Sequence, residues 1–466
     1  MHAFGDDALG DHDAVALAEQ VANGKVSPGE LVEAALARAE AVNPRLNAVS
    51  LLDADGARAR AAGSPTGVLA GVPTFIKGLA SVAGLPNRFG SRAMPDTPAE
   101  ANSPTVDQIE STGLLPVGLS TTPEFGLTAT TEPALTGITR NPWNPNHSTG
   151  GSSGGSAALV AAGVVPIAHA NDGGGSIRIP AASCGLVGLK PSRGRVDKEP
   201  DPKLMPVDFT IDGVVTRTVR DTAAFLYGAE QYRPVPRLAP VGHVTNPLDR
   251  PLRVGVIEER VDGVRFDSAN RAAVADAATT MEELGHHVEL IPNPFPAHFA
   301  ADFILLWSMV PFAMWHAGAR VMGEGWDRDQ LEPWSKWLVR HFRRNAARAP
   351  TAFRRLRKFA TEGYSASLQD HDVLLSSTLA SPVPEVGYLD PTMDGDVLYE
   401  RLLNHVAITP IQNVGGGPAI SLPLAQDGGG LPLGIQFAAD IGQEALLLAL
   451  ALQLEESEPW PTLASN

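Results

Sequence analysis

Two clusters of glycine and serine restrict how the chain can fold between residues 148 and 176. Residues 148–156 read Ser-Thr-Gly-Gly-Ser-Ser-Gly-Gly-Ser, and residues 173–176 read Gly-Gly-Gly-Ser. A small, apolar run at 157–162 and a β-branched run at 164–169 lie between them. Both clusters are too short to act as spacers, and both are surrounded by apolar segments. We therefore expect two tight turns inside the fold, with a closely packed helix at 157–162 and a buried strand at 164–169.

Further short apolar runs predict an α/β fold. Residues 71–76 and 114–119 are typical of buried strands, and the first of these runs leads directly into Lys77. From residue 252 onward the pattern alternates between strand and helix. The predicted segments are strands at 252–257, 288–291, 372–375, 417–423 and 434–437 and a helix at 268–284. We expect one large α/β sheet protein that forms a single domain of residues 1–466.

The clearest helix start in the sequence lies at Ser27. Ser27 can cap the helix, Pro28 suits the first helical position, and Glu30 completes a capping box. Apolar residues follow at helical spacing as far as Asn43-Pro44, where we expect the helix to end.

Residues 302–369 read as mostly helical and are unusually aromatic. They contain five of the seven tryptophans of the chain, namely Trp307, Trp315, Trp326, Trp334 and Trp337. We expect a helical insertion at 295–370 within the sheet protein.

Charge and cysteine content exclude several function classes. The formal net charge of −16 is opposite to that of a nucleic-acid-binding protein. The basic stretch at 340–358 alternates with apolar residues, and we favour the solvated side of amphipathic helices over an anion site. Cys184 is the single cysteine, so neither an intrachain disulfide nor a Cys-based zinc site can form.

The sequence also predicts where the chain acts. Residues 1–13 are acidic and lack the apolar core of a secretory signal. The most apolar run, residues 303–315, is shorter than the ~18 residues that a membrane span needs. We expect a cytoplasmic enzyme with neither a membrane nor a nucleic acid as partner.

The turn at 173–176 has the composition of a site that stabilises negative charge. Hydrolysis of an amide needs a nucleophile, a base and hydrogen-bond donors for the developing oxyanion. Because glycine has no Cβ, the N–H groups of Gly173, Gly174, Gly175 and Ser176 can converge on a small volume. A substrate carbonyl near Ser176 Oγ could meet them there. A tight surface turn is the alternative, and it fits poorly with the apolar residues on both sides.

The same glycine-rich residues allow two other interpretations. Residues 150–154 match the Gly-x-Ser-x-Gly nucleophile elbow, and His147 or His169 could be the base of a Ser-His-Asp esterase. The elbow follows a strand, whereas a loop precedes residue 150, so we interpret the match as accidental. A P-loop requires Lys and then Ser or Thr after its last glycine, which the residues after Gly155 do not provide.

Three motifs carry a family resemblance. Residues 150–156 read Gly-Gly-Ser-Ser-Gly-Gly-Ser, residues 172–178 read Asp-Gly-Gly-Gly-Ser-Ile-Arg, and residues 184–191 read Cys-Gly-Leu-Val-Gly-Leu-Lys-Pro. Together they resemble the amidase signature family. Further similar segments lie at 71–77, 122–125, 141–144, 217–221 and 418–423. The resemblance implies the amidase signature fold, an α/β/α arrangement with a large mixed central β-sheet flanked by helices, in which residues 60–230 form the signature catalytic core.

The resemblance also implies which residues act. Ser176 corresponds to the nucleophile, Ser152 to a bridging serine held by a cis peptide bond, and Lys77 to the base. The N–H groups of residues 173–176 correspond to the oxyanion hole. The reaction proceeds through an acyl-enzyme and needs no histidine, metal or cofactor. Lys77 must be neutral to accept a proton, and burial would lower its pKa accordingly.

Neighbouring residues have supporting roles in our interpretation. Asp172 and Arg178 would pair and brace the loop rather than take part in the chemistry. Ser153 would hydrogen-bond the backbone. Cys184 would pack in the core, as free cysteines commonly do, and Lys190 would support the core.

The resemblance implies a small-molecule amide or carbamate as substrate, because the chain is similar to family members that hydrolyse cyclic amides and aryl carbamates. Aryl and alkyl amides, anilides, esters and urethanes are the expected classes. The insertion at 295–370 would cap the pocket. Trp307, Trp315, Trp334 and Trp337 would form its walls, although packing of the helices explains these residues equally well. Gly173 stands where relatives often carry a larger residue, which predicts a roomier site or a more flexible loop.

Three alternatives to an independent amidase remain open at the level of sequence. One is the A subunit of an amidotransferase that acts with partner subunits on misacylated tRNA, and another is the Ser-His-Asp esterase. The third is a non-catalytic binding scaffold, which the intact set of Lys77, Ser152 and Ser176 argues against. A homodimer is the candidate assembly.

Overall fold

An eight-stranded mixed β-sheet forms the centre of the molecule. The computed structural model describes residues 1–198 and 208–464. The strand order is β4-β6-β5-β10-β11-β9-β7-β8; the pairs from β4 to β9 are antiparallel, and β7 is parallel to both β9 and β8. The strands are β4 (Ile167–Asp172), β5 (Val187–Lys190), β6 (Ile211–Thr216), β7 (Arg253–Ile257), β8 (His287–Leu290), β9 (Val373–Ser377), β10 (Ala419–Gln426) and β11 (Pro432–Ala438). The large mixed sheet that the resemblance implies is confirmed.

A second, three-stranded sheet holds β2 beside the large one. Its order is β1 (Val49–Leu52), β3 (Leu115–Ser120) and β2 (Pro73–Lys77), with β2 parallel to β3. Thr74 Oγ1 of β2 donates a hydrogen bond to the Ile167 carbonyl of β4 at 3.0 Å. The last residue of β2, Lys77, therefore lies next to the edge strand of the large sheet.

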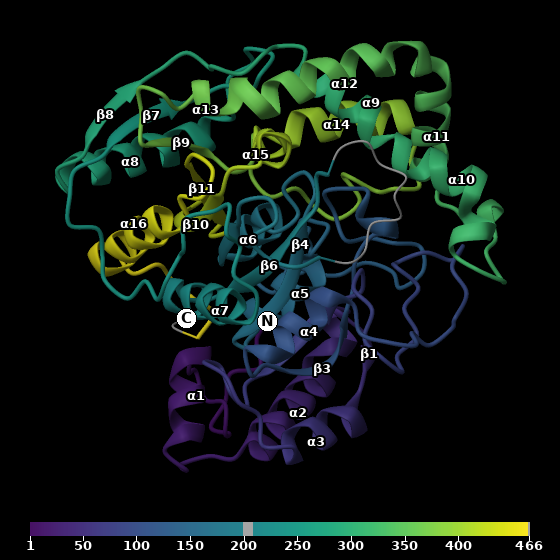
Figure 1. Ribbon diagram of the computed structural model, residues 1–466, viewed down its shortest axis with the longest axis vertical. Coiled ribbons are helices and arrows are strands. Elements are labelled where there is room, and N and C mark those ends of the chain that lie inside the picture. The colour runs from purple at the N-terminus through teal and green to yellow at the C-terminus, as the bar shows by residue number, and fades with distance from the viewer. Residues whose placement is uncertain (199–207, 465–466) are drawn as a thin grey trace.

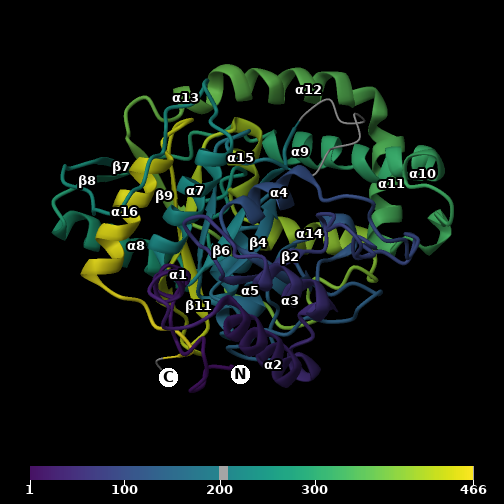
Figure 2. The same ribbon diagram turned by 60° about the horizontal axis from the view of Figure 1, so that its bottom comes forward.

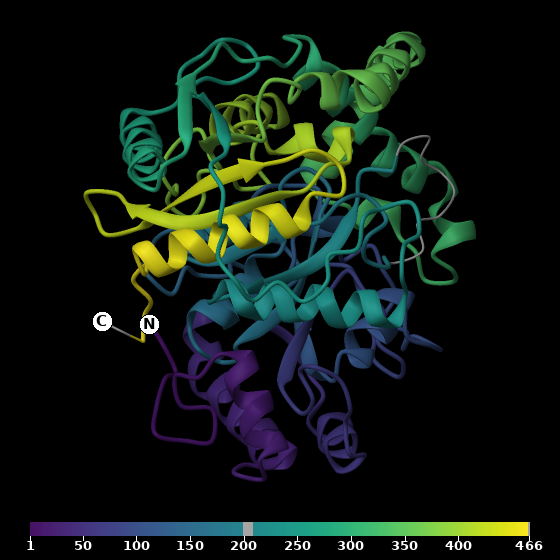
Figure 3. The same cartoon turned by 60° about the vertical axis from the view of Figure 1, so that its left-hand side comes forward.

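Helices flank the large sheet, and small residues allow close contact. Helices α7 and α16 lie side by side across the sheet (Figure 3). A Cβ atom at Gly434 of β11 would come within 2.3 Å of Ala182 Cβ in α6, so only glycine permits this packing distance. The helices around the sheets are α1 (Ala14–Ala22), α2 (Pro28–Leu46), α3 (Ala54–Ala62), α4 (Pro104–Ser111), α5 (Gly154–Ala161), α6 (Arg178–Cys184), α7 (Val219–Tyr232), α8 (Ser268–Glu283), α14 (Gly395–His405), α15 (Thr409–Gly415) and α16 (Glu444–Ser457).

Four helices between β8 and β9, which we call the cap helices, gather at one end of the molecule. They lie at the end opposite α2 and α3 (Figures 1 and 2). Part of their apolar surface packs with α15, the short turns that precede β9 and residues of β7 and β9. The rest packs in a second cluster with Leu127, Ile179 and Leu398. The cap helices are α9 (Phe299–Trp307), α10 (Met309–Val321), α11 (Pro333–Asn345) and α12 (Ala349–Lys358), and the short helix α13 (Tyr364–Ala366) follows them.

Several predicted element boundaries are wrong for local reasons. The capping box of Ser27 and Glu30 is present, but the helix continues through Pro44 and ends at Asn47, whose left-handed backbone (φ 52°) supplies the helix end. Strand β4 begins three residues later than predicted, because Gly163 ends helix α5 in a left-handed turn and Val164 donates its N–H to the Leu159 carbonyl. Helix α5 begins at Gly154, earlier than the apolar run at 157–162 suggests.

One helical stretch exceeds the apolar length expected from the sequence. By length and composition alone, Phe299–Arg320, which spans α9 and most of α10, could cross a membrane. Of its most apolar 18 residues, 44% are buried inside the protein, and a core helix of a soluble protein meets the same criterion. This stretch is therefore weak evidence for a membrane span.

Candidate active site

Lys77 lies at the end of β2 and is completely buried. Its Nζ is 2.7 Å from Ser152 Oγ and 2.6 Å from Asn171 Oδ1. Burial lowers the pKa of Lys77 from its usual value to about 7, and the carboxylates of Asp212 and Asp172 oppose this shift. The Lys77 amine therefore lies beside the Ser152 hydroxyl and has a pKa close to neutral pH.

Ser152 follows a cis peptide bond and opens the turn into α5. The Gly151–Ser152 bond is cis, as the family resemblance implies. A side chain at position 151 would place its Cβ 2.5–2.7 Å from backbone atoms of Thr130, so the turn requires glycine at this position. Ser152 itself is 2% exposed. The packing of Gly151 against Thr130 fixes the direction in which Ser152 leaves the turn toward Lys77.

Ser176 lies two residues before α6 and borders a cavity. Among the described residues, its Oγ has no hydrogen-bond partner, so it is not bonded to Ser152 in this structure. The N–H groups of Gly173, Gly174 and Ser176 are likewise unbonded within the described part of the chain. The N–H of Gly175 differs, because it donates to Asp172 Oδ1 at 2.6 Å. Three of the four amide groups expected at an oxyanion hole are thus available to a ligand.

Asp172 and Arg178 form the ion pair that we expected to brace this loop. Both are completely buried, with Arg178 Nε 2.9 Å from Asp172 Oδ2 and Nη2 3.0 Å from Oδ1. Burial alone would raise the pKa of Asp172, but the charge and hydrogen bonds of Arg178 outweigh it and hold the pKa at about 2. Arg178 also bonds to Gln412, Gln436 and Asn413. The pair joins the loop at 173–176 to α15 and β11.

The remaining neighbours occupy structural positions. Ser153 Oγ donates to the Asn171 carbonyl at 3.2 Å and accepts from the Asn171 N–H. Cys184 is buried, and burial raises the pKa of its thiol. Lys190 is also buried, and its Nζ donates to the Pro191 carbonyl at 2.7 Å. None of these contacts reaches the cavity beside Ser176.

Sequence reasoning missed Asn171 and the pair of His169 and Asp212. His169 and Asn171 alternate along β4 and therefore face the same side of the strand, toward Lys77. His169 Nδ1 accepts the Lys77 backbone N–H at 3.2 Å, and its Nε2 is 2.8 Å from Asp212 Oδ1. The sequence signal that could have identified them is the two-residue spacing of His169 and Asn171 on a strand that ends at the glycine cluster.

His169 and His147, the two histidines considered as bases, make no hydrogen bond to the serines in the described part of the chain. Both ring nitrogens of His169 are engaged away from them. Within residues 1–198 and 208–464, no group of three or more His, Cys, Asp or Glu side chains could hold a metal ion.

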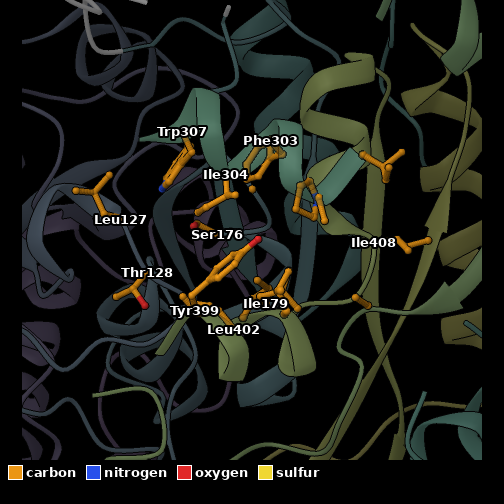
Figure 4. A pocket seen from close by; sticks show the side chains of 18 of the residues that line it. Leu127, Thr128, Ser176, Ile179, Phe303, Ile304, Trp307, Tyr399, Leu402 and Ile408 are labelled. Carbon is orange, nitrogen blue, oxygen red and sulfur yellow. The ribbon is translucent and has the colours of Figure 1, made fainter. Parts of the chain in front are cut away.

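An apolar cavity of about 130 Å³ opens beside Ser176 (Figure 4). The cap helix α9 covers one side, and the segment from α14 to α15 covers the other. An apolar cavity of similar volume accepts a benzene ring in another protein. Its principal apolar lining residues are Leu127, Phe303, Ile304, Trp307, Trp334 and Leu402.

Two of the four tryptophans expected to form the walls line this cavity. Trp307 and Trp334 face it, whereas Trp337 stacks behind Trp334 with ring centroids 4.9 Å apart. Trp315 lies under the guanidinium of Arg328, 5.2 Å from the ring centre. Trp307 and Trp334 thus line the cavity, whereas Trp337 and Trp315 pack outside it.

Trp307 also explains the glycine at position 173. A Cβ atom there would lie 2.9 Å from Cη2 of Trp307, so the ring fills the space that a larger residue would occupy. The prediction of a roomier site at this position is therefore wrong, because the cap closes over the glycine loop.

Comparison with known proteins agrees with this geometry. The Amidase family model matches residues 30–448 of the chain. The AmiC protein of Mycobacterium tuberculosis is 49% identical over 465 residues, which cover 99% of this chain and 97% of AmiC. The structure of 6-aminohexanoate cyclic dimer hydrolase complexed with substrate superposes with a TM-score of 0.87 at 32% identity, covering 99% of this chain and 100% of the other. A bacterial aryl acylamidase superposes with a TM-score of 0.84 at 28% identity, covering 96% of both chains.

The mixed α/β fold and the hydrogen bond between the buried Lys77 and Ser152 agree with these relatives. The chain belongs to the amidase signature family. It is accordingly a hydrolase that acts on amide C–N bonds other than peptide bonds.

Proposed function

We propose that Lys77, Ser152 and Ser176 form the catalytic relay of this amidase, with Ser176 as the nucleophile. The observation that carries the proposal is the 2.7 Å hydrogen bond between the buried Lys77 Nζ and Ser152 Oγ, next to the cavity that Ser176 borders. A lysine with a pKa near 7 is a competent base at neutral pH, because a sufficient fraction is unprotonated.

The proposed reaction has two halves. Ser176 Oγ attacks the substrate carbonyl carbon while its proton passes to Ser152 Oγ and the Ser152 proton passes to Lys77 Nζ. The tetrahedral intermediate then breaks its C–N bond, and the proton returns from Lys77 through Ser152 to the leaving amine. Water hydrolyses the resulting Ser176 ester by the same relay. A hydrogen bond between Ser176 and Ser152 would form when substrate is bound, since catalytic contacts often tighten only in the complex.

We assign the oxyanion hole to three of the four amide groups that the sequence suggested. Gly173, Gly174 and Ser176 supply free N–H donors, whereas the Gly175 N–H holds Asp172 in place. Loss of one oxyanion donor typically costs about 3–4 kcal/mol of barrier. The Asp172–Arg178 pair keeps the loop in one conformation, so the donors need no reorganisation during the reaction.

The cavity supports aryl or short alkyl acyl groups as substrates. Its lining is apolar and its volume is close to that of a site for one aromatic ring. The similar structures include a 6-aminohexanoate cyclic dimer hydrolase and an aryl acylamidase, which agree with this class. We extend the proposal to anilides, esters and aryl carbamates (urethanes). We further propose that the enzyme is cytoplasmic and forms a homodimer, which fractionation and light scattering would test.

Hydrolysis of p-nitroanilides and aryl carbamates by the isolated chain tests the proposal. Ser176→Ala and Lys77→Ala should each lose nearly all activity while remaining folded by circular dichroism. Ser111→Ala is the matched control, because its hydroxyl only donates to the Gln108 carbonyl within α4. Wild-type rates in Lys77→Ala would contradict the relay and favour a histidine base. A wild-type chain that is inactive until partner subunits are added would favour the amidotransferase subunit instead.

A further inference from the structure

One polar side chain in the apolar cavity has no role in the proposed relay. Tyr399 of α14 lines the cavity that Ser176 borders. In Figure 4 its ring reaches across the cavity, and the hydroxyl oxygen is the tip of the side chain. Burial raises the pKa of this phenol, so the group remains a protonated hydrogen-bond donor at neutral pH.

The Tyr399 hydroxyl has no hydrogen-bond partner among residues 1–198 and 208–464. Another hydroxyl in the cavity wall, Thr128 Oγ1, is also unpaired but is shielded from contact. Tyrosine hydroxyls that are partly buried usually find a partner. A donor that is left free in an apolar cavity indicates that the partner comes with the ligand.

Packing holds the ring in place independently of the hydroxyl. The Tyr399 ring lies 5.4 Å from the Trp337 ring and 6.1 Å from the His341 ring, both on α11. The side chain is therefore fixed on the cap side while its hydroxyl end is exposed to the cavity. Removal of the hydroxyl alone should leave this packing intact.

Tyr399 also borders a second, polar cavity. This cavity has a volume of about 470 Å³ and shares Ile304 and Tyr399 with the first one. Its other side chains include Asn345, Arg348 and Thr351 of the cap. Tyr399 thus stands where the apolar lining that includes Ser176 gives way to polar lining.

We propose that Tyr399 is a specificity-determining residue that donates a hydrogen bond to an acceptor on the acyl group. This acceptor lies farther from Ser176 than the apolar part of the acyl group does. The inference rests on the proposed function for the placement of the acyl group. Tyr399 would select acyl groups that carry an apolar or aryl portion next to the scissile carbonyl and an ether, carbonyl or similar acceptor at the far end.

A pair of isosteric substrates tests this recognition. The p-nitroanilides of 4-methoxybenzoic and 4-ethylbenzoic acid differ by one oxygen in place of a methylene. Wild type should prefer the methoxy substrate, and Tyr399→Phe should lower its kcat/KM about three- to tenfold, the usual worth of one neutral hydrogen bond. The ethyl substrate should be unaffected. Tyr388→Phe is the matched control, because that ring lies on the surface against Arg401.

Binding separates this inference from the proposed relay. Calorimetry of 4-methoxybenzamide and 4-ethylbenzamide with Ser176→Ala, with and without Tyr399→Phe, measures recognition when no turnover occurs. A methoxy preference that Tyr399→Phe removes supports the inference even if Ser176 proves not to be the nucleophile. Equal effects of Tyr399→Phe on the binding of both ligands would overturn the inference. A methoxy preference that depends on Tyr399 only in ligands with the methoxy group on the aniline ring would overturn it as well.

Discussion

The signature core and the cap helices are built by different kinds of interaction. In the core, ionisable groups are buried and hydrogen-bonded: Lys77 contacts Ser152 and Asn171, and Asp172 forms an ion pair with Arg178. The cap contributes stacked rings, such as Phe303 and Trp307 with centroids 5.6 Å apart. Buried polar networks tolerate little change, whereas apolar walls can be repacked at lower cost. In our proposal the core determines which reaction is performed, and the cap determines which acyl groups fit.

A carboxylate joins the two regions. Glu124 lies in a turn between Pro123 and Leu127 that borders Ser152, and it accepts hydrogen bonds from the Glu332 N–H at 2.9 Å and from Ser335 Oγ. Both of these donors belong to the start of α11. The glycine loop is also covered directly, by Trp307. The cap is thus attached to the core at the site and not only at its periphery.

The largest effect should come from breaking the buried pair of the core. Arg178→Met leaves Asp172 charged and unpaired, which typically costs about 3–5 kcal/mol. Urea unfolding should show this loss together with loss of activity. Arg58→Met is the matched control, because Arg58 pairs with Glu33 on the surface and such pairs contribute little. Equal stability of the two variants would contradict the bracing role.

The core should also impose a pH dependence on catalysis. Since the pKa of Lys77 is lowered to about 7, the neutral base is lost as the pH falls below that value. We expect kcat/KM to fall about tenfold for each pH unit below 7 and to level off above it. Asp172, with a pKa of about 2, stays charged and adds no step between pH 5 and 9. A flat profile across that range would mean that Lys77 is not the base.

Changes in the cap should alter selectivity with less effect on the reaction. Trp307→Ala removes a wall of the cavity, so kcat/KM for benzoyl anilides should fall about tenfold, mainly through KM. Acetyl anilides, which do not reach the wall, should be hydrolysed nearly as before. Trp315→Ala is the control, because Trp315 packs under Arg328 outside the cavity. A fall in kcat for both substrates would show that the cap shapes the catalytic loop as well.

The last effect concerns the stability of a variant at Glu332, which lies at the junction between the core and the cap helices. Burial and the nearby Glu124 raise the pKa of Glu332 to about 8, well above the ~4.3 of an unfolded chain. The protonated form is favoured by folding, so its contribution is complete below about pH 4 and is lost as the pH rises toward 8. Glu332→Gln should therefore become progressively more stable relative to wild type as the pH rises from 5 to 8. Thermal unfolding at both values measures the difference.

The core could be predicted from the sequence further than the cap could. The glycine cluster at 173–176 indicated a turn that could bind an oxyanion near Ser176, whereas the roles of Lys77 and Ser152 were implied by the resemblance to the amidase signature family. Asn171 was missed, since one polar residue on a buried strand has no distinctive local pattern. For the cap helices, the sequence indicated only a helical and aromatic composition. Which tryptophans reach the cavity depends on how four helices pack over the glycine loop, and no local pattern specifies that packing.

The most direct test of the central claim is to locate the acyl group on the enzyme during turnover. A 4-methoxybenzoyl substrate is mixed with wild type, quenched with acid within milliseconds, and digested for mass spectrometry. The relay predicts one acylated peptide, modified at Ser176, and no adduct in Ser176→Ala. An adduct at another serine or at a histidine-activated residue, with Ser176 unmodified while product forms, would contradict the account.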